Sequence, residues 1–145
     1  MRNKYCFHII VGLLTLVFIF SCSNSTSPSQ ENYALILNDT NSVKLNEYLL
    51  NSNENLRLSF KNLLEDSRCP IGAECFWEGN AKVEIEFIIG DETHLLELNT
   101  YYNFQRDSTL NNYYLKLIDV LPYPTLDGSY LDEESIIKIF ISKNY

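Results

Sequence analysis

The stretch Leu56-Arg57-Leu58-Ser59-Phe60-Lys61 decides the fold class, because apolar and polar side chains alternate along it without a break. Residues 82–87 repeat the pattern, with Val83, Ile85 and Phe87 on one face and charged residues on the other. Successive side chains of an extended strand point to opposite faces. Each stretch therefore predicts a β-strand with one buried face.

Less regular strand-like stretches surround these two, and together they predict about seven strands. Gly90-Asp91-Glu92 has the composition of a tight hairpin turn. The alternation slips at Leu117-Ile118, which predicts a β-bulge, and Pro122-Tyr123-Pro124 should end that strand. The seven predicted strands are residues 33–37, 43–49, 56–61, 82–89, 93–98, 113–120 and 136–142.

No stretch after residue 21 shows the periodicity of an amphipathic helix. Short strands separated by turns, without helical crossovers, are typical of an antiparallel β-sandwich, either Ig-like or a partly open barrel. In the last strand we expect Ile137, Ile139 and Ile141 to face the core. We thus predict one all-β domain over residues 33–145, with residues 100–112 and 122–134 as its longest irregular segments.

The amino terminus has the order of an export signal helix. Arg2 and Lys4 precede the apolar segment 7–20, which is shorter than the roughly 20 residues that a membrane-spanning helix needs. Ile19-Phe20-Ser21-Cys22 resembles the bacterial lipobox. The resemblance implies that residues 1–21 are removed and that Cys22 receives a diacylglycerol and an acyl chain such as palmitate. Residues 22–32 would then form a lipidated, flexible tether.

This reading places the protein in the bacterial cell envelope, attached to a membrane through the lipid on Cys22. Ser23 after the cysteine favours the outer membrane of a Gram-negative host, facing the periplasm or the surface. Without residues 1–21 the chain carries nine basic and 19 acidic residues, a net charge of −10. Such a charge disfavours nucleic acid as a partner, because phosphate binding depends on Lys and Arg. We expect a monomeric domain.

The exported part retains two thiols, Cys69 and Cys75. The environment beyond the membrane is oxidising, and there an even pair of cysteines predicts a disulfide. A bridge over this seven-residue ring contributes about 2 kcal/mol by loop entropy, so it shapes a loop more than it holds the fold. A zinc site would need further ligands, and the spacing is not that of a Cys-x-x-Cys redox pair.

One segment carries a more specific signal: Asp66-Ser67-Arg68-Cys69-Pro70, followed by Cys75, Trp77, Gly79 and Ala81. With Val120-Leu121-Pro122-Tyr123-Pro124, it resembles a family of mostly uncharacterised bacterial exported lipoproteins, whose signature has the form DSRCP, Cys, Trp-x-Gly-x-Ala. The resemblance implies a β-rich domain and no established activity. Glu78 and Phe76 depart from the pattern and alter the surface of the loop. We expect Asp66 to end a strand and Arg68 to pair with it or with Glu65.

The candidate binding surface consists of Arg68, Trp77, Glu78, Tyr101, Tyr102 and Tyr123. Aromatic side chains beside long loops can bind a protein or a glycan, although tyrosine is also common at the ends of sheets. We therefore expect a non-enzymatic binding or structural lipoprotein. The alternative is a protease-inhibitor-like module that uses the constrained ring between Cys69 and Cys75.

No catalytic, metal or cofactor site is predicted. His94 is the one histidine after residue 21, and we expect it to be a solvent-facing strand residue. A hydrolase that uses His94 remains a remote alternative, since no Gly-x-Ser-x-Gly motif or free cysteine accompanies it. Asp132-Glu133-Glu134 predicts a solvated loop more than a calcium site.

Overall fold

A computed structural model describes residues 33–127 and 132–144 of the chain. The chain divides into two units, Met1–Glu31 and Asn32–Tyr145, and every described residue belongs to the second. The predicted signal and Cys22, the predicted lipidation site, lie outside the described residues. Within the described part, no helix has the length and apolar character needed to span a bilayer.

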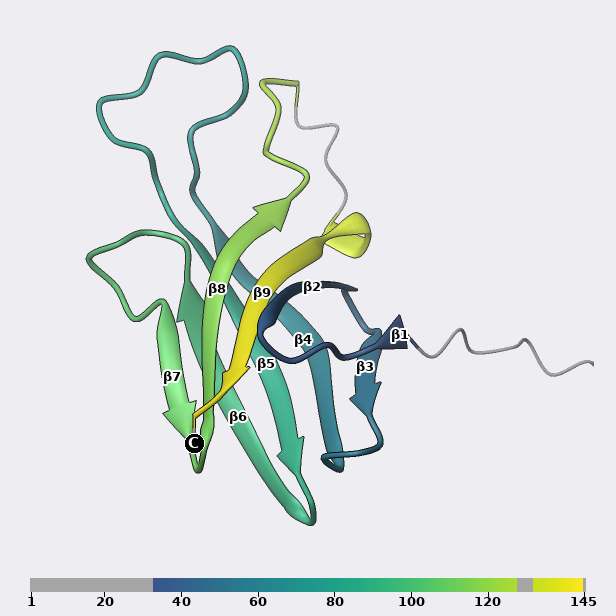
Figure 1. Cartoon of the computed structure of the whole chain (residues 1–145). Coiled ribbons are helices and arrows are strands. Elements are labelled where there is room, and N and C mark those ends of the chain that lie inside the picture. The colour runs from purple at the N-terminus through teal and green to yellow at the C-terminus, as the bar shows by residue number, and fades with distance from the viewer. Residues whose placement is uncertain (1–32, 128–131, 145) are drawn as a thin grey trace, which may run out of the picture. The chain divides into compact units, whose positions relative to one another are not determined.

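The described residues form nine strands in two sheets, so the prediction of an antiparallel β-sandwich is confirmed (Figure 1). One sheet has the order β1-β3-β4-β5-β6 and the other the order β2-β9-β8-β7. Every pairing is antiparallel except that of β1 with β3. The elements are β1 (Tyr33–Ala34), β2 (Asp39–Lys44), β3 (Tyr48–Asn51), β4 (Leu56–Asp66), β5 (Ala81–Ile89), β6 (Glu92–Asn99), β7 (Asp107–Leu110), β8 (Tyr113–Leu121), a 3₁₀ helix η1 (Asp132–Glu134) and β9 (Ile136–Lys143).

The core lies between the sheets and uses the alternating residues predicted for it. Phe60 of β4 and Phe87 of β5 are fully buried, as is Leu117 of β8. Each such side chain contributes roughly 1.5–3 kcal/mol by leaving water. The remaining predicted core residues are also buried: Leu56, Leu58, Val83, Ile85, Ile137, Ile139 and Ile141.

The predicted strand at residues 43–49 is wrong, because the chain changes sheets in its middle. Asn46 has a φ of 66°, in the left-handed region that asparagine tolerates better than most residues. β2 ends before it in one sheet, and β3 begins after it in the other. The turn is held by hydrogen bonds that Leu45 N–H donates to Ser135 O (2.8 Å) and Asn46 N–H to Phe60 O (2.9 Å).

Four smaller predictions have mixed outcomes, since two are confirmed and two are only partly correct. The bulge is confirmed, since the pairing of β8 with β9 shifts register between Leu117 and Asp119. The hairpin is also confirmed, with Gly90 at a φ of 60°. The strand predicted at 33–37 pairs only over Tyr33–Ala34, before Asn38 turns the chain at a φ of 61°. Residues 100–112 are not wholly irregular, because they contain β7.

His94 does not face solvent as predicted. It lies on β6 with the inward-facing Leu96 and Leu98, and its side chain is 28% exposed. Because β6 is the edge strand of its sheet, this inward face is only partly covered near His94. Its Nε2 lies 3.6 Å from Glu92 Oε2 on the same strand.

Candidate functional site

Three loops meet at one end of the sandwich, the upper end in Figure 1. They follow β4 (residues 67–80), β6 (residues 100–106) and β8 (from residue 122). Backbone and side-chain hydrogen bonds join them: Ile71 N–H donates to Pro124 O (2.9 Å), and Tyr101 N–H donates to Asn80 Oδ1 (3.1 Å). The six residues of the candidate binding surface and the two cysteines of the predicted disulfide all lie in these loops.

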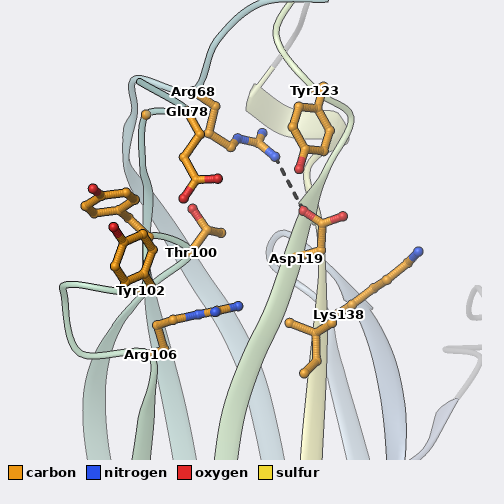
Figure 2. Close-up of a pocket in the computed structure, with 11 residues that line it drawn as sticks. Arg68, Glu78, Thr100, Tyr102, Arg106, Asp119, Tyr123 and Lys138 are labelled. Carbon is orange, nitrogen blue, oxygen red and sulfur yellow. Dashed lines mark ion pairs between the residues drawn. The ribbon is translucent and has the colours of Figure 1, made fainter. Parts of the chain in front are cut away.

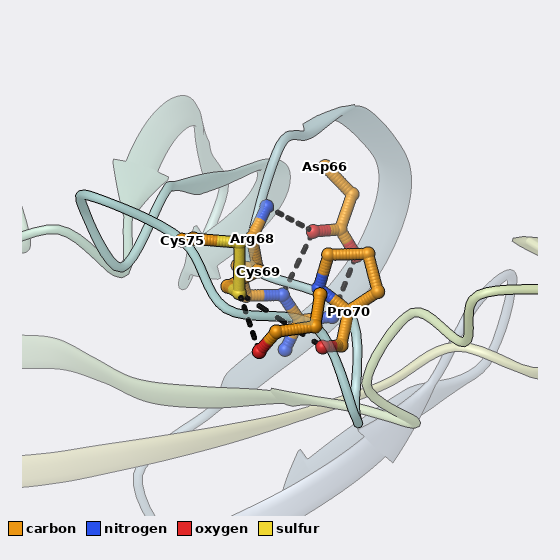
Figure 3. The surroundings of a disulfide bond; sticks show 6 residues. Asp66, Arg68, Cys69, Pro70 and Cys75 are labelled. Atoms are coloured by element: carbon orange, nitrogen blue, oxygen red, sulfur yellow. Dashed lines mark hydrogen bonds and ion pairs between the residues drawn. A yellow bond between two sulfur atoms is a disulfide. The ribbon is translucent and has the colours of Figure 1, made fainter.

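Cys69 and Cys75 form the predicted disulfide, with their Cα atoms 6.0 Å apart (Figure 3). The ring that they close is anchored at its base, where Cys69 N–H donates to Glu78 O (3.0 Å). Its outer part is open to solvent, because Ile71 is 64% exposed. Next to the ring, Phe76 is fully exposed.

Arg68 is buried, with an exposure of 4%, so it is not the open surface residue that the sequence suggested. Its Nε and Nη2 donate to the two carboxylate oxygens of Asp66 at 2.8 and 2.6 Å. Nη1 donates to Val120 O and Nη2 also to Pro122 O (3.0 Å), which ties the end of β4 to the end of β8. The predicted pairing with Asp66, the last residue of β4, is confirmed.

The surroundings of Arg68 favour its positively charged form. Burial acts to lower the pKa of the guanidinium, but the hydrogen bond and charge of Asp66, together with the charges of Tyr123 and Asp119, raise the pKa overall. Asp119 Oδ1 adds a second carboxylate, 3.7 Å from Nη1. Arg68 is therefore committed to contacts within the protein.

Four aromatic side chains form a contiguous group, here called the aromatic cluster: Trp77, Tyr101, Tyr102 and Phe104. Tyr101 lies at its centre, with ring centroids 6.1 Å from Trp77, 4.7 Å from Tyr102 and 5.6 Å from Phe104. The three outer rings are 55%, 66% and 52% exposed, respectively. A hydrogen bond to Tyr102, together with burial, raises the pKa of Tyr101, so the Tyr101 phenol is neutral at physiological pH.

A buried pair of amide side chains, Asn80 and Asn99, fixes the loop that carries most of the cluster. Sequence reasoning did not identify this pair. Asn80 Nδ2 donates to Asn99 Oδ1 (2.9 Å), and Asn99 Nδ2 donates to Gln105 O (3.1 Å). Since Asn80 Oδ1 also accepts from Tyr101 N–H, both ends of the loop 100–106 are fixed to the sheet. The aromatic cluster is thus built on a satisfied polar network, which favours a single arrangement of the rings.

Two depressions flank the cluster. The first, called the Arg106 pocket, has a volume of about 390 Å³ (Figure 2). The second, called the Trp77 groove, has a volume of about 420 Å³. The Arg106 pocket is lined by Arg68, Glu78, Gly79, Thr100, Tyr101, Tyr102, Arg106, Ile118, Asp119, Tyr123 and Lys138. The Trp77 groove is lined by Glu65, Trp77, Asn80, Lys82, Glu97, Asn99, Phe104 and Gln105.

The structure therefore brings Arg68, Glu78, Tyr101, Tyr102 and Tyr123 to one pocket, and places Trp77 on the other side of the cluster. Sequence reasoning missed Phe104 and Arg106, which lie in the loop 100–106 beside the predicted tyrosines. Within residues 33–127 and 132–144, no three His, Cys, Asp or Glu side chains are grouped so that they could hold a metal ion.

Comparisons with known proteins give no relative for this chain: no family model, curated protein sequence or solved structure matches it.

Proposed function

We propose that this chain is an exported lipoprotein of the bacterial cell envelope, anchored through Cys22, whose sandwich domain binds a glycan without catalysis. The lipobox-like Ile19-Phe20-Ser21-Cys22 supports the anchor, and a Gram-negative host would carry it in the outer membrane. The DSRCP signature supports membership of the exported lipoprotein family that it resembles. The domain would act as a monomer.

The observation that carries the proposal is the aromatic cluster. Trp77, Tyr102 and Phe104 are more than half exposed, although packing against the core would bury rings that had only a structural role. Their contacts with Tyr101 hold them in place before any ligand arrives. Preorganised rings lose little conformational entropy on binding, so they suit a recognition surface.

The surroundings of the cluster favour a glycan over a protein. The core of a protein interface is depleted of charged residues, whereas Glu65, Lys82 and Glu97 line the Trp77 groove beside the rings. Sugars have apolar C–H faces that pack on aromatic rings and hydroxyl groups that bond to carboxylates and amides. A surface that alternates rings with such polar groups matches both parts of a sugar.

Binding of the full-length, detergent-solubilised protein to an array of bacterial and host glycans tests the proposal. We expect the wild type to bind a defined set, and Trp77→Ala to weaken that binding about tenfold, or 1.4 kcal/mol. Leu95→Ala is the matched control, because Leu95 is 65% exposed on β6 but lines neither depression. Binding to no glycan, or equal binding by Trp77→Ala, would refute the proposal.

A second candidate function rests on the ring between Cys69 and Cys75. Ile71 in this ring and Phe76 directly after it are exposed, as the recognition side chains of a protease inhibitor are. A panel of proteases tests this alternative directly. Inhibition that disappears in Phe76→Ala but persists in Trp77→Ala would favour it over glycan binding.

A further inference from the structure

We infer that the Arg106 pocket binds the carboxylate of an acidic sugar unit, such as a uronic acid within the glycan. This inference rests on the proposed glycan binding and names the chemistry of one subsite. It starts from Arg106, whose side chain extends from the loop 100–106 across the pocket (Figure 2).

Among the described residues, the guanidinium of Arg106 lacks the partners that such a group normally has. Its Nε is buried, and no atom among the described residues accepts a hydrogen bond from it. The guanidinium also forms no ion pair within the described part of the chain. A buried donor without an acceptor destabilises the folded protein. Such a group in a native protein calls for an explanation, and a bound anion supplies one.

The neighbouring charges show what kind of anion fits. Asp119 Oδ1 lies 3.7 Å from Arg68 Nη1, and no ion pair among the described residues joins Asp119 to Arg106. Lys138 also lines the pocket, but its ammonium group points away from it in Figure 2, whereas Glu78 adds one carboxylate. The pocket thus offers one cation, Arg106, and one acceptor group, Glu78, beyond the pair formed by Arg68 and Asp119. This mixture suits a ligand with a single acid group among hydroxyls better than a dense polyanion, which Glu78 would repel.

The shape of the pocket fits the same ligand. A volume of about 390 Å³ lies at the small end of the range for ligand pockets, roughly 300–1,000 Å³. Tyr102 and Tyr123 stand on opposite sides of it in Figure 2, where their rings can contact the faces of a sugar. The guanidinium of Arg106 can hold a carboxylate through two parallel hydrogen bonds. Glu78 and Thr100 line the pocket beside it and can bond to hydroxyl groups.

The test compares each uronate-containing oligosaccharide with its carboxyl-reduced form, by calorimetry on the full-length protein. We expect the wild type to prefer the acidic form about tenfold. Arg106→Gln should remove this preference while leaving affinity for the reduced form, and Arg106→Lys should restore part of it, because lysine keeps the charge without the fork. Arg57→Gln is the control. It also removes one positive charge, but Arg57 lies at the start of β4, whereas the loop that lines the pocket follows the end of β4, and Arg57 does not line the pocket.

The outcomes separate the two proposals. If no glycan binds, the proposed function fails and this inference fails with it. If glycans bind but the wild type does not distinguish acidic from reduced forms, only the inference is overturned. The same holds if Arg106→Gln keeps the full preference.

Discussion

The guanidinium of Arg68 lies over the ring of Tyr123, with its Cζ atom 4.3 Å from the ring centroid. This contact joins segments more than 50 residues apart, because Arg68 follows β4 and Tyr123 follows β8. Together with the bonds from Arg68 to Val120 O and Pro122 O, it holds the ends of two strands in different sheets together. The two parts of the DSRCP-type signature thus meet in one structural link.

Arg68→Gln should therefore be strongly destabilising. The substitution leaves the Asp66 carboxylate, whose side chain is 9% exposed, without its cation. Removing one partner of a buried ion pair typically costs about 3–5 kcal/mol. Chemical denaturation followed by circular dichroism measures the change in the free energy of unfolding.

The control for Arg68 is Lys82→Gln. Lys82 also pairs with a carboxylate, that of Glu97, but this pair is solvent-exposed, and such pairs contribute about 0–1 kcal/mol. A loss in Arg68→Gln no larger than that in Lys82→Gln would show that Arg68 does not link the strands energetically.

Gly79→Ala should disrupt the loop 67–80. Gly79 has a φ of 77°, and a Cβ atom there would lie 2.7 Å from the carbonyl carbon of Ser67. Since Ser67 N–H donates to Asn80 O (2.7 Å), the two chain segments cannot separate without losing hydrogen bonds. We expect the free energy of unfolding to fall by clearly more than the roughly 1–2 kcal/mol that the left-handed conformation alone costs. Thermal unfolding measures the change.

Gly90→Ala separates the steric effect from the conformational one. Gly90 also has a positive φ, 60°, but the nearest atom to an added Cβ is Asn55 Nδ2 at 3.9 Å. Its loss should stay near the cost of the backbone conformation, about 1–2 kcal/mol. Equal losses in the two variants would contradict the close approach at Gly79.

The sequence pattern predicted the parts of the fold in which each strand has one buried face. β4, β5 and β9 carry an apolar residue at every second position of their core segments, so these buried residues could be named in advance. β2 and β3 could not be separated by the same reasoning. The apolar pattern continues through Leu45, and only the left-handed Asn46 shows that the chain changes sheets there.

The candidate site was predicted in its composition but not in its arrangement. The loop tyrosines and Trp77 stood out because exposed rings beside long loops suggest binding. The prediction that Arg68 lies on the surface was wrong. A charged residue is mostly exposed unless it is paired, and the partners Val120 and Pro122 are far from Arg68 in the sequence. The sequence did not single out Arg106, because the lack of an acceptor for its buried Nε is a property of the folded loop.

Cys22→Ala should move the protein from the membrane fraction to the soluble fraction. The reason is that the acyl chains on Cys22 would provide the stable attachment, while the acidic domain is not attracted to anionic lipid. Fractionation and mass spectrometry of the native product measure both properties. Ser23→Ala is the control, and an unacylated Cys22 in the wild type would contradict the anchor.

A second ionic link, at Glu54, gives the protein a defined response to acid. Glu54 lies between β3 and β4, and its Oε2 accepts hydrogen bonds from Lys143 Nζ at 2.6 Å and from Tyr113 Oη at 3.0 Å. The bond from Lys143 is the main reason that the pKa of Glu54 is lowered from its ordinary value of 4.5, and the bond from Tyr113 adds to it. The contact joins the loop after β3 to β8 and β9 of the other sheet.

Because the folded protein holds Glu54 at a lowered pKa, the unfolded chain binds more protons at this site in acid. The stabilisation is therefore complete above pH 4.5 and declines as the pH falls through the lowered pKa. Glu54→Gln should be less stable than the wild type at pH 7, and the difference should shrink as the pH falls through that range. Denaturation at a series of pH values measures this, with the exposed Glu133→Gln as control. A difference between wild type and Glu54→Gln that does not change with pH would show that the ionised carboxylate contributes nothing to stability.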